Sequence, residues 1–145
     1  MNVINFDRTP PNCRFEIDDF EQQPWGYSRP FDFIHGRDLE GCVRDYDQLF
    51  REAKNNLVPG GYFEIAGFDV NSTSDDDTHE KGKNMAFLVD ALYECSKEFG
   101  KPLKNLKTWK NKMLEAGFVD VEEHVFKVGC CLMPHNCRAD GSVPD

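Results

Sequence analysis

The sequence predicts an α/β fold with a mostly parallel sheet. Three observations predict it. Strand-like and helix-like stretches alternate along the chain, one strand-helix-turn-strand unit is complete, and polar residues stand directly after several strands. The chain has 145 residues, which is the usual length of one compact domain.

Two short strands are expected first, at residues 3–6 and 14–17. Each is rich in β-branched or aromatic residues and is followed by aspartate and turn-forming residues. Residues 22–30, with Pro24, Gly26 and Pro30, are predicted to form a loop, and the third strand follows at residues 31–35.

The third strand begins a predicted βαβ unit. Apolar residues recur at spacings of three and four over residues 43–57, which predicts a helix with one apolar face. The Val58-Pro59-Gly60-Gly61 sequence should end this helix, and a strand resumes at residues 62–68. Such units join parallel strands by a right-handed crossover.

The second half of the chain predicts two helices and a strand. An apolar stripe runs from Met85 to Phe99 and is expected to face the core. A shorter helix at about residues 106–116 should turn Trp109 inward, and residues 118–128 are predicted to form the last strand. Residues 129–145 are expected to be an irregular tail.

Charge and composition disfavour several classes of partner. Twenty-six acidic and seventeen basic residues give a net charge of −9, which disfavours nucleic acid and anionic membranes. No leader-like start and no run of about 20 apolar residues is present, so a cytoplasmic protein is expected, with the nucleus as the alternative.

The six cysteines are irregularly spaced, which favours free thiols in a reducing compartment. Cys130, Cys131, His135 and Cys137 lie close together in the tail, but adjacent cysteines rarely serve one tetrahedral ion. No metal site is therefore predicted.

Polar or small residues follow four of the predicted strands. They are Asp7, Asp19, His35-Gly36-Arg37 and Gly67-Phe68-Asp69. Since open parallel sheets bind ligands at the carboxyl ends of their strands, these residues predict a site for a nucleoside-like ligand. The alternative is that they only mark turns of the chain.

Three stretches together carry a family resemblance. They are PPNCRFEIDDFEQQPW, RPFDFIHGRDLEGCVRDYDQLFREAKNNLVPGGYFEI and TWKNKMLEAGFVDVEEHVFKV. They closely resemble the fungal LaeA-like group of S-adenosylmethionine-dependent methyltransferases, which belongs to the Rossmann-like class I superfamily. The resemblance extends from Val3 to Val128 and implies a partial class I methyltransferase domain over residues 1–128. It also implies methyl transfer from S-adenosyl-L-methionine to a small molecule of fungal secondary metabolism.

The resemblance also assigns roles to residues at the cofactor. Asp7 takes the place of the residue that holds the ribose. Asp19 and Phe20 would flank the adenine, with Asp18 as the less favoured substitute for Asp19. The alternatives are that Asp7 and Asp18 cap turns and that Phe20 lies in the core.

Three residues at the end of the third strand match the region around the reacting methyl group. His35, Gly36 and Arg37 would border the methionine moiety, and His35 is the candidate catalytic base for an acceptor that carries a proton. The alternatives are a histidine with a structural hydrogen bond and an arginine paired with Glu40 or another local carboxylate.

One part of the family pattern is missing. The superfamily has a first strand and a GxGxG loop before the segment that matches residues 2–7, and no GxG sequence occurs in this chain. We therefore expect a sheet without its first strand, in a truncated or degenerate copy or in a chain completed by a partner. The alternative function is an inactive methyltransferase-like fragment that forms homo- or hetero-oligomers through an exposed sheet edge.

Overall fold

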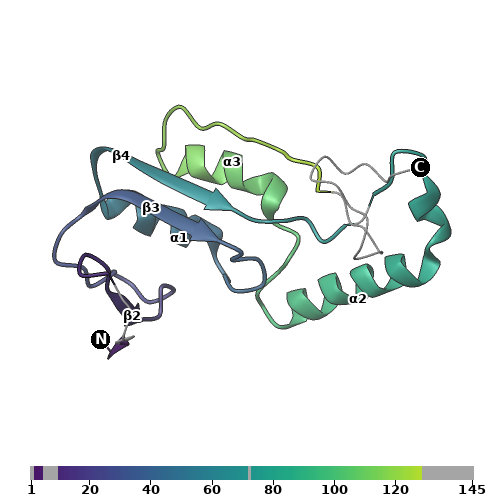
Figure 1. Cartoon of the computed structure of the whole chain (residues 1–145), viewed down its shortest axis with the longest axis horizontal. Helices are drawn as coiled ribbons and strands as arrows, with labels where there is room; N and C mark the ends of the chain where they lie inside the picture. Colours follow the sequence, from purple (N-terminus) through teal and green to yellow (C-terminus); the bar gives the residue numbers. More distant parts are fainter. Residues whose placement is uncertain (1, 5–9, 72, 129–145) are drawn as a thin grey trace.

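The computed structural model describes residues 2–4, 10–71 and 73–128. The α/β class is confirmed (Figure 1). In chain order, the elements are β1 (Asn2–Ile4), β2 (Phe15–Ile17), β3 (Phe31–Arg37), α1 (Tyr46–Asn55), β4 (Leu57–Ala66), the short 3-10 helix η1 (Thr78–Lys81), α2 (Lys83–Glu98) and α3 (Leu106–Glu115).

The predicted βαβ unit is present. Strands β3 and β4 pair in parallel, with α1 between them in the chain. The helix begins three residues later than predicted, because the Asp45 side chain accepts hydrogen bonds from the N–H groups of Asp47 and Gln48 and caps it. It ends two residues earlier than predicted, and β4 begins at Leu57. Residues 58–61 were expected to form the turn before the strand, but they lie inside β4. A register shift between Phe31 and Phe33 accommodates them.

The first two strands form a separate sheet. Strand β1 pairs with β2 in the antiparallel direction, and Ile4 lies opposite Phe15. The carboxyl end of β1 is therefore beside the amino end of β2. The expectation that the ends of all four strands meet at one edge of a parallel sheet is wrong for this pair. Asp7 lies outside the described residues.

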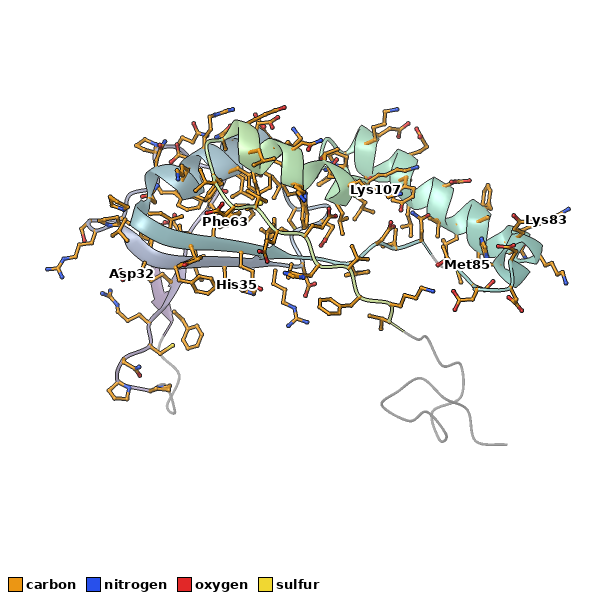
Figure 2. All side chains as sticks on the ribbon, turned by 90° about the horizontal axis from the view of Figure 1, so that it is seen from above. Asp32, His35, Phe63, Lys83, Met85 and Lys107 are labelled. Carbon is orange, nitrogen blue, oxygen red and sulfur yellow. The ribbon has the colours of Figure 1, made fainter. Side chains whose placement is uncertain are left out.

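The core lies on one face of the β3–β4 sheet. Seven residues form it, mainly from α1 and α3: Val43, Tyr46, Leu49, Phe50, Ala53, Trp109 and Phe118. Ile34, Phe63 and Ile65 contribute from the strands, since alternate residues of a strand point to the same face. Figure 2 shows both helices on this side of the sheet and His35 on the other. That other face is open among the described residues, with Phe33 54% and Tyr62 76% exposed.

Helix α2 extends beyond the sheet (Figure 1). The prediction that its apolar stripe faces the core is wrong for most of its residues, because Met85, Leu88 and Leu92 are exposed and only Val89 is buried. The stripe marks an apolar face, but periodicity alone does not say what covers such a face.

The predicted last strand is also absent. Residues 118–128 form no helix or strand, and although Phe118 packs in the core, Val125 and Phe126 are exposed. A strand needs a partner for its backbone hydrogen bonds, and no described strand pairs with this segment. The predicted tail, residues 129–145, lies outside the described residues.

Candidate functional site

The segment that follows β2 packs against the start of α1 and forms a pocket of about 310 Å³. We call it the Asp19 pocket. Its lining residues come from the segment and from the start of α1: Asp19, Phe20, Glu21, Val43, Arg44, Asp45, Gln48, Leu49 and Glu52. Two adjacent residues that were predicted for the adenine site are therefore brought to one pocket.

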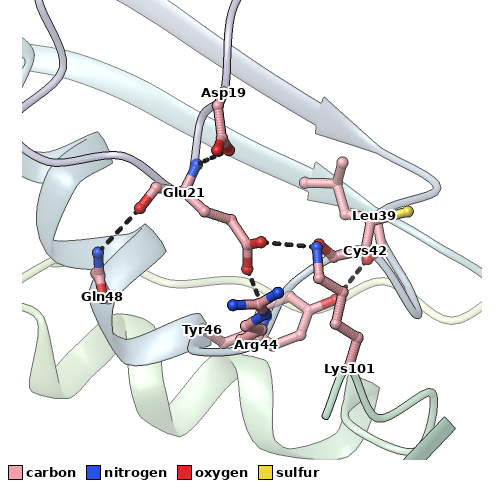
Figure 3. A network of polar contacts seen from close by, with 8 residues as sticks. All are labelled: Asp19, Glu21, Leu39, Cys42, Arg44, Tyr46, Gln48 and Lys101. Atoms are coloured by element: carbon pink, nitrogen blue, oxygen red, sulfur yellow. Dashed lines mark hydrogen bonds and ion pairs between the residues drawn. The ribbon is translucent and has the colours of Figure 1, made fainter. Parts of the chain in front are cut away.

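Glu21 holds this segment in place (Figure 3). Its carboxylate accepts hydrogen bonds from the Arg44 N–H at 2.7 Å and from the Lys101 Nζ at 2.6 Å. The Glu21 carbonyl accepts a further bond from the Gln48 side chain, and Lys101 also donates to the Cys42 carbonyl. Burial opposes ionisation of Glu21, but Lys101 and the Arg44 N–H outweigh it and hold the pKa of Glu21 below its ordinary value.

Asp19 and Asp18 have different partners. One oxygen of Asp19 accepts from the Glu21 N–H at 3.0 Å, and its second oxygen has no hydrogen-bond partner among the described residues. Asp18 accepts from the Asp19 N–H at 2.9 Å and is not among the residues that line the Asp19 pocket. Of the two carboxylates, only that of Asp19 belongs to a residue that lines the pocket.

Phe20 connects this pocket with a second one. It is 38% exposed, and its carbonyl accepts a bond from the Trp25 indole N–H at 2.8 Å. The second pocket, which we call the aromatic hollow, has a volume of about 200 Å³ and lies beside β3. Its lining residues are almost all aromatic: Phe20, Trp25, Tyr27, Phe31, Phe33 and Ile34.

His35 lies on the open face of β3 (Figure 2), and Arg37, two residues further along the strand, is on the same face. Neither residue lines either pocket. The His35 Nδ1 is 3.0 Å from the Glu64 carboxylate, and its ring is 6.2 Å from that of Phe33. Arg37 pairs with the neighbouring Asp38 at 3.3 Å, which is the local pairing offered as its alternative. Strand alternation explains the separation, because Ile34 packs on the helix side and its neighbours then point away.

Gly36 and Gly67 lie where side chains would meet close neighbours. A Cβ on Gly36 would lie 3.0 Å from Leu39, so packing alone accounts for glycine there. A Cβ on Gly67 would overlap the Glu40 carboxylate and come within 2.9 Å of the Trp109 ring. The space in front of Gly67 is therefore filled by the chain itself.

Glu40 was named from the sequence only as a possible partner of Arg37, which pairs with Asp38 instead. The Glu40 Oε1 is buried and, like the Trp109 indole nitrogen, has no hydrogen-bond partner within the described ranges. Burial, with the Glu40 charge as the second cause, raises the pKa of Tyr46 well above its ordinary value, and the Tyr46 hydroxyl donates to the Leu39 carbonyl. Only its place after a strand end could have drawn attention to Glu40.

Asp69, the last residue predicted for the sheet edge, anchors α2. It accepts hydrogen bonds from Asn71 and, at 3.1 Å, from the Tyr93 hydroxyl. Burial raises the pKa of Asp69, but these hydrogen bonds outweigh it, so the pKa lies below its ordinary value.

In the described ranges, no group of three or more His, Cys, Asp or Glu side chains is placed to hold a metal ion. No helix there has the length and apolar character needed to cross a membrane. The cysteines and histidine of the tail lie outside these ranges.

The chain belongs to a family of methyltransferase domains. The family described as "Methyltransferase domain" matches residues 2–123, which is most of the chain. This finding confirms the fold class and the resemblance stated above, and methyltransferases generally take the methyl group from S-adenosylmethionine.

Several fungal relatives are similar over most of this chain. Methyltransferase pytC of Aspergillus terreus is 31% identical over 138 residues, which cover 95% of this chain and 42% of pytC. Protein-methionine methyltransferase laeA of Emericella nidulans is 30% identical over 128 residues, covering 86% of this chain and 33% of laeA. Secondary metabolism regulator LAE1 of Cochliobolus heterostrophus is 26% identical over 132 residues, which cover 88% of this chain and 43% of LAE1.

The chain therefore spans less than half the length of these curated relatives. No solved structure matches it.

Proposed function

We propose that the chain is the adenosyl-binding part of an S-adenosylmethionine-dependent methyltransferase that acts on a small molecule of secondary metabolism. One observation carries the proposal: in a chain of the methyltransferase-domain family, a carboxylate and an aromatic ring, Asp19 and Phe20, line one pocket. The small-molecule acceptor is inferred from relatives named for methyl transfer and secondary metabolism, although the name of laeA states a protein methionine as its acceptor.

The residues of the Asp19 pocket fit an adenine. The second Asp19 oxygen can accept from the exocyclic amine, and Phe20 offers an exposed aromatic surface beside it. The volume of about 310 Å³ is at the lower end of the range of roughly 300–1,000 Å³ for small-molecule sites. Asp18 does not line this pocket and is the weaker candidate. The role of Asp7 at the ribose stays a prediction.

When bound, S-adenosylmethionine supplies a methyl group that its sulfonium has already activated. The chain then has to orient the acceptor and exclude water. His35 is the proposed base, because Glu64 beside its Nδ1 can fix the ring and leave Nε2, which has no partner among the described residues, to take a proton. Since His35 is on the open face, the acceptor would approach from there, with Gly36 and Arg37 as its neighbours in β3.

The binding step can be tested by calorimetric titration of the whole chain with S-adenosylmethionine. We expect binding in the micromolar range, and Asp19→Ala should weaken it about tenfold through loss of one charge-assisted hydrogen bond. Asp32→Asn is the matched control, since Asp32 is exposed on β3 and lines neither pocket. Absence of binding by the unmodified chain, or an equal loss in both variants, contradicts the proposal.

The second candidate function is a non-catalytic subunit. It is favoured by the open sheet face, where Phe33 and Tyr62 are exposed, and by the outer edge of β3, which no described strand pairs. Light scattering, which measures the mass of the particles in solution, distinguishes this candidate from the enzyme. Oligomers that the Phe33→Lys variant no longer forms, together with no binding of S-adenosylmethionine in the titration, would support the non-catalytic subunit. Monomers would exclude homo-oligomers through this face.

A further inference from the structure

The aromatic hollow gathers rings that the fold leaves partly in water. Five of its six lining residues are aromatic, and the sixth is Ile34. Phe20, Tyr27 and Phe33 are 38%, 40% and 54% exposed. Contiguous exposed apolar surface commonly marks a binding site, and the hollow, at about 200 Å³, is larger than the roughly 150 Å³ that hold a benzene ring. The hollow therefore has room for a small ligand or a head group.

Trp25 is held at both of its N–H groups. Its backbone N–H donates to the Glu52 carboxylate at 3.3 Å, and its indole N–H donates to the Phe20 carbonyl at 2.8 Å. Because the polar end of the indole is already engaged, a ligand in the hollow interacts with Trp25 through the ring. Of the aromatic rings, that of tryptophan attracts a cation most strongly.

The neighbouring rings are packed edge to face. The ring centroids of Trp25 and Tyr27 are 6.1 Å apart at an angle of 85°, and those of Tyr27 and Phe31 are 4.8 Å apart at 79°. Adjacent rings are thus nearly perpendicular and form walls that face in different directions, as in a cage. Since the rings hold one another, little side-chain freedom is lost when a ligand binds.

The charges that act on Tyr27 are acidic. Burial, and after it the charges of Asp18 and Glu16, raises the pKa of Tyr27 above its ordinary value. Glu16 is paired with Arg14 at 3.1 Å, whereas Asp18 has no ion pair among the described residues. The Asp18 charge therefore favours a cation over an anion beside these rings.

Among the described residues, no lysine or arginine of the chain occupies the hollow. The contacts of a cation with a ring are Lys54 over Phe118 and Lys104 over Tyr93, and neither ring lines the hollow. The attraction of the aromatic faces for a positive charge is consequently left for a ligand.

We propose that the aromatic hollow is a cage for the methylated ammonium group of a small molecule. The rings and Asp18 attract the positive charge, and the methyl groups contact the rings without losing strongly held water. A bare ammonium is more strongly hydrated and gains less, and a neutral aromatic ligand gains nothing from Asp18. The proposal does not depend on the proposed function, because this site and the Asp19 pocket share only Phe20.

Proton NMR titration of the whole chain with choline tests the cage. The matched probe is the neutral isostere of choline, in which a carbon atom replaces the charged nitrogen. We expect choline to bind at least about fivefold more tightly than the isostere, because several rings and Asp18 attract its charge. Its methyl signal should move upfield, since protons above an aromatic face are shielded. No binding of choline, or equal binding of the two probes, overturns the proposal.

A pair of ring variants tests whether choline binds in the hollow. Tyr27→Leu removes a ring that packs against two others and should weaken choline binding by about two- to fivefold. Tyr62→Leu is the matched control, because Tyr62 is exposed on β4 and does not line the hollow. Circular dichroism checks that both variants fold. Equal losses in the two variants overturn the assignment to this site.

A pair of charge variants tests the acidic contribution. Asp18→Asn should weaken choline binding by about twofold and leave binding of the isostere unchanged. Asp90→Asn removes the same charge from an exposed position of α2, which extends beyond the sheet (Figure 1), and should change neither. Equal effects of the two variants overturn the role of Asp18. A trimethyllysine peptide that binds more tightly than choline overturns the assignment to a small molecule.

Discussion

Replacing Lys101 by methionine should loosen the segment that carries Asp19. The Lys101 Nζ is 2.6 Å from the Glu21 carboxylate and 2.7 Å from the Cys42 carbonyl. Both side chains of the pair are about one-fifth exposed, at 20% and 23%. A charge-assisted hydrogen bond contributes about 1.5–3 kcal/mol when buried and an exposed ion pair about 0–1. We therefore expect a loss of about 1–2 kcal/mol in the free energy of unfolding.

The assay is a double-mutant cycle with Lys101→Met and Glu21→Gln in urea denaturation. The coupling energy should be about 1 kcal/mol, and Lys101→Met should lower the melting temperature by about 2–8 °C for a chain of this size. Lys110→Met is the control, since Lys110 is exposed and has no ion pair among the described residues. If the losses of the two single variants add up to that of the double variant, Lys101 does not act through Glu21 and the reasoning fails.

The same pair has a signature in pH. The folded-state pKa of Glu21 lies below its ordinary value of 4.5, so the stabilisation is complete above 4.5 and is lost as the pH falls through the folded-state value. The unmodified chain should therefore lose more stability than Glu21→Gln in that acidic window, and the two should keep a constant difference above it. Urea denaturation of the unmodified chain and of Glu21→Gln at several pH values across the window measures this difference. A difference that stays constant through the window would contradict the prediction.

Three further predictions concern the fold around the site. Gly67→Ala should lower the free energy of unfolding, measured by urea denaturation, by about 1–3 kcal/mol because the new methyl group overlaps Glu40, and adding Glu40→Ala should recover part of the loss. Phe50→Ala removes a side chain with no exposed surface and should cost about 3–5 kcal/mol in the same assay. Asp45→Ala removes the cap of α1 and should cost about 1 kcal/mol in thermal unfolding followed by circular dichroism.

The βαβ unit could be predicted from sequence because its signals are local. The apolar positions of α1 are three or four residues apart, and Ile34 and Phe63 lie in short apolar strands on either side of the helix. The cap at Asp45 could not be predicted, because it depends on the geometry of the helix end. The inclusion of Gly60 in β4 could not be predicted either, because it depends on how β3 and β4 pair.

The partners of the remaining segments could not be predicted. Alternating apolar residues in 118–128 allow a strand, but a strand forms only where another strand supplies hydrogen bonds. The stripe of α2 likewise defines an apolar face without naming what it contacts. The antiparallel pairing of β1 with β2 depends in the same way on contacts between distant residues.

The candidate site was predicted in part. Asp19 and Phe20 are adjacent in sequence, so a pocket beside one is readily shared by the other. His35 comes from another strand, and the alternation of β3 turns it to the open face. The apolar face of α1 implied that Ile34 points toward the helix. Because neighbouring residues of a strand point to opposite faces, it could have been deduced that His35 points away from the helix. The contact between Glu21 and Lys101 could not have been predicted, because the two residues are 80 positions apart in the sequence.

The Glu21–Lys101 contact joins the two ends of a long stretch of chain that contains β3, α1, β4 and α2. The entropy lost on bringing such ends together grows only slowly with the length of the stretch, so insertions within it would weaken the contact little. The linker between α2 and α3 thereby contacts the segment that carries Asp19. On the proposal that the Asp19 pocket holds the adenosyl group, substitutions in that linker would change ligand affinity without altering any residue that touches the ligand.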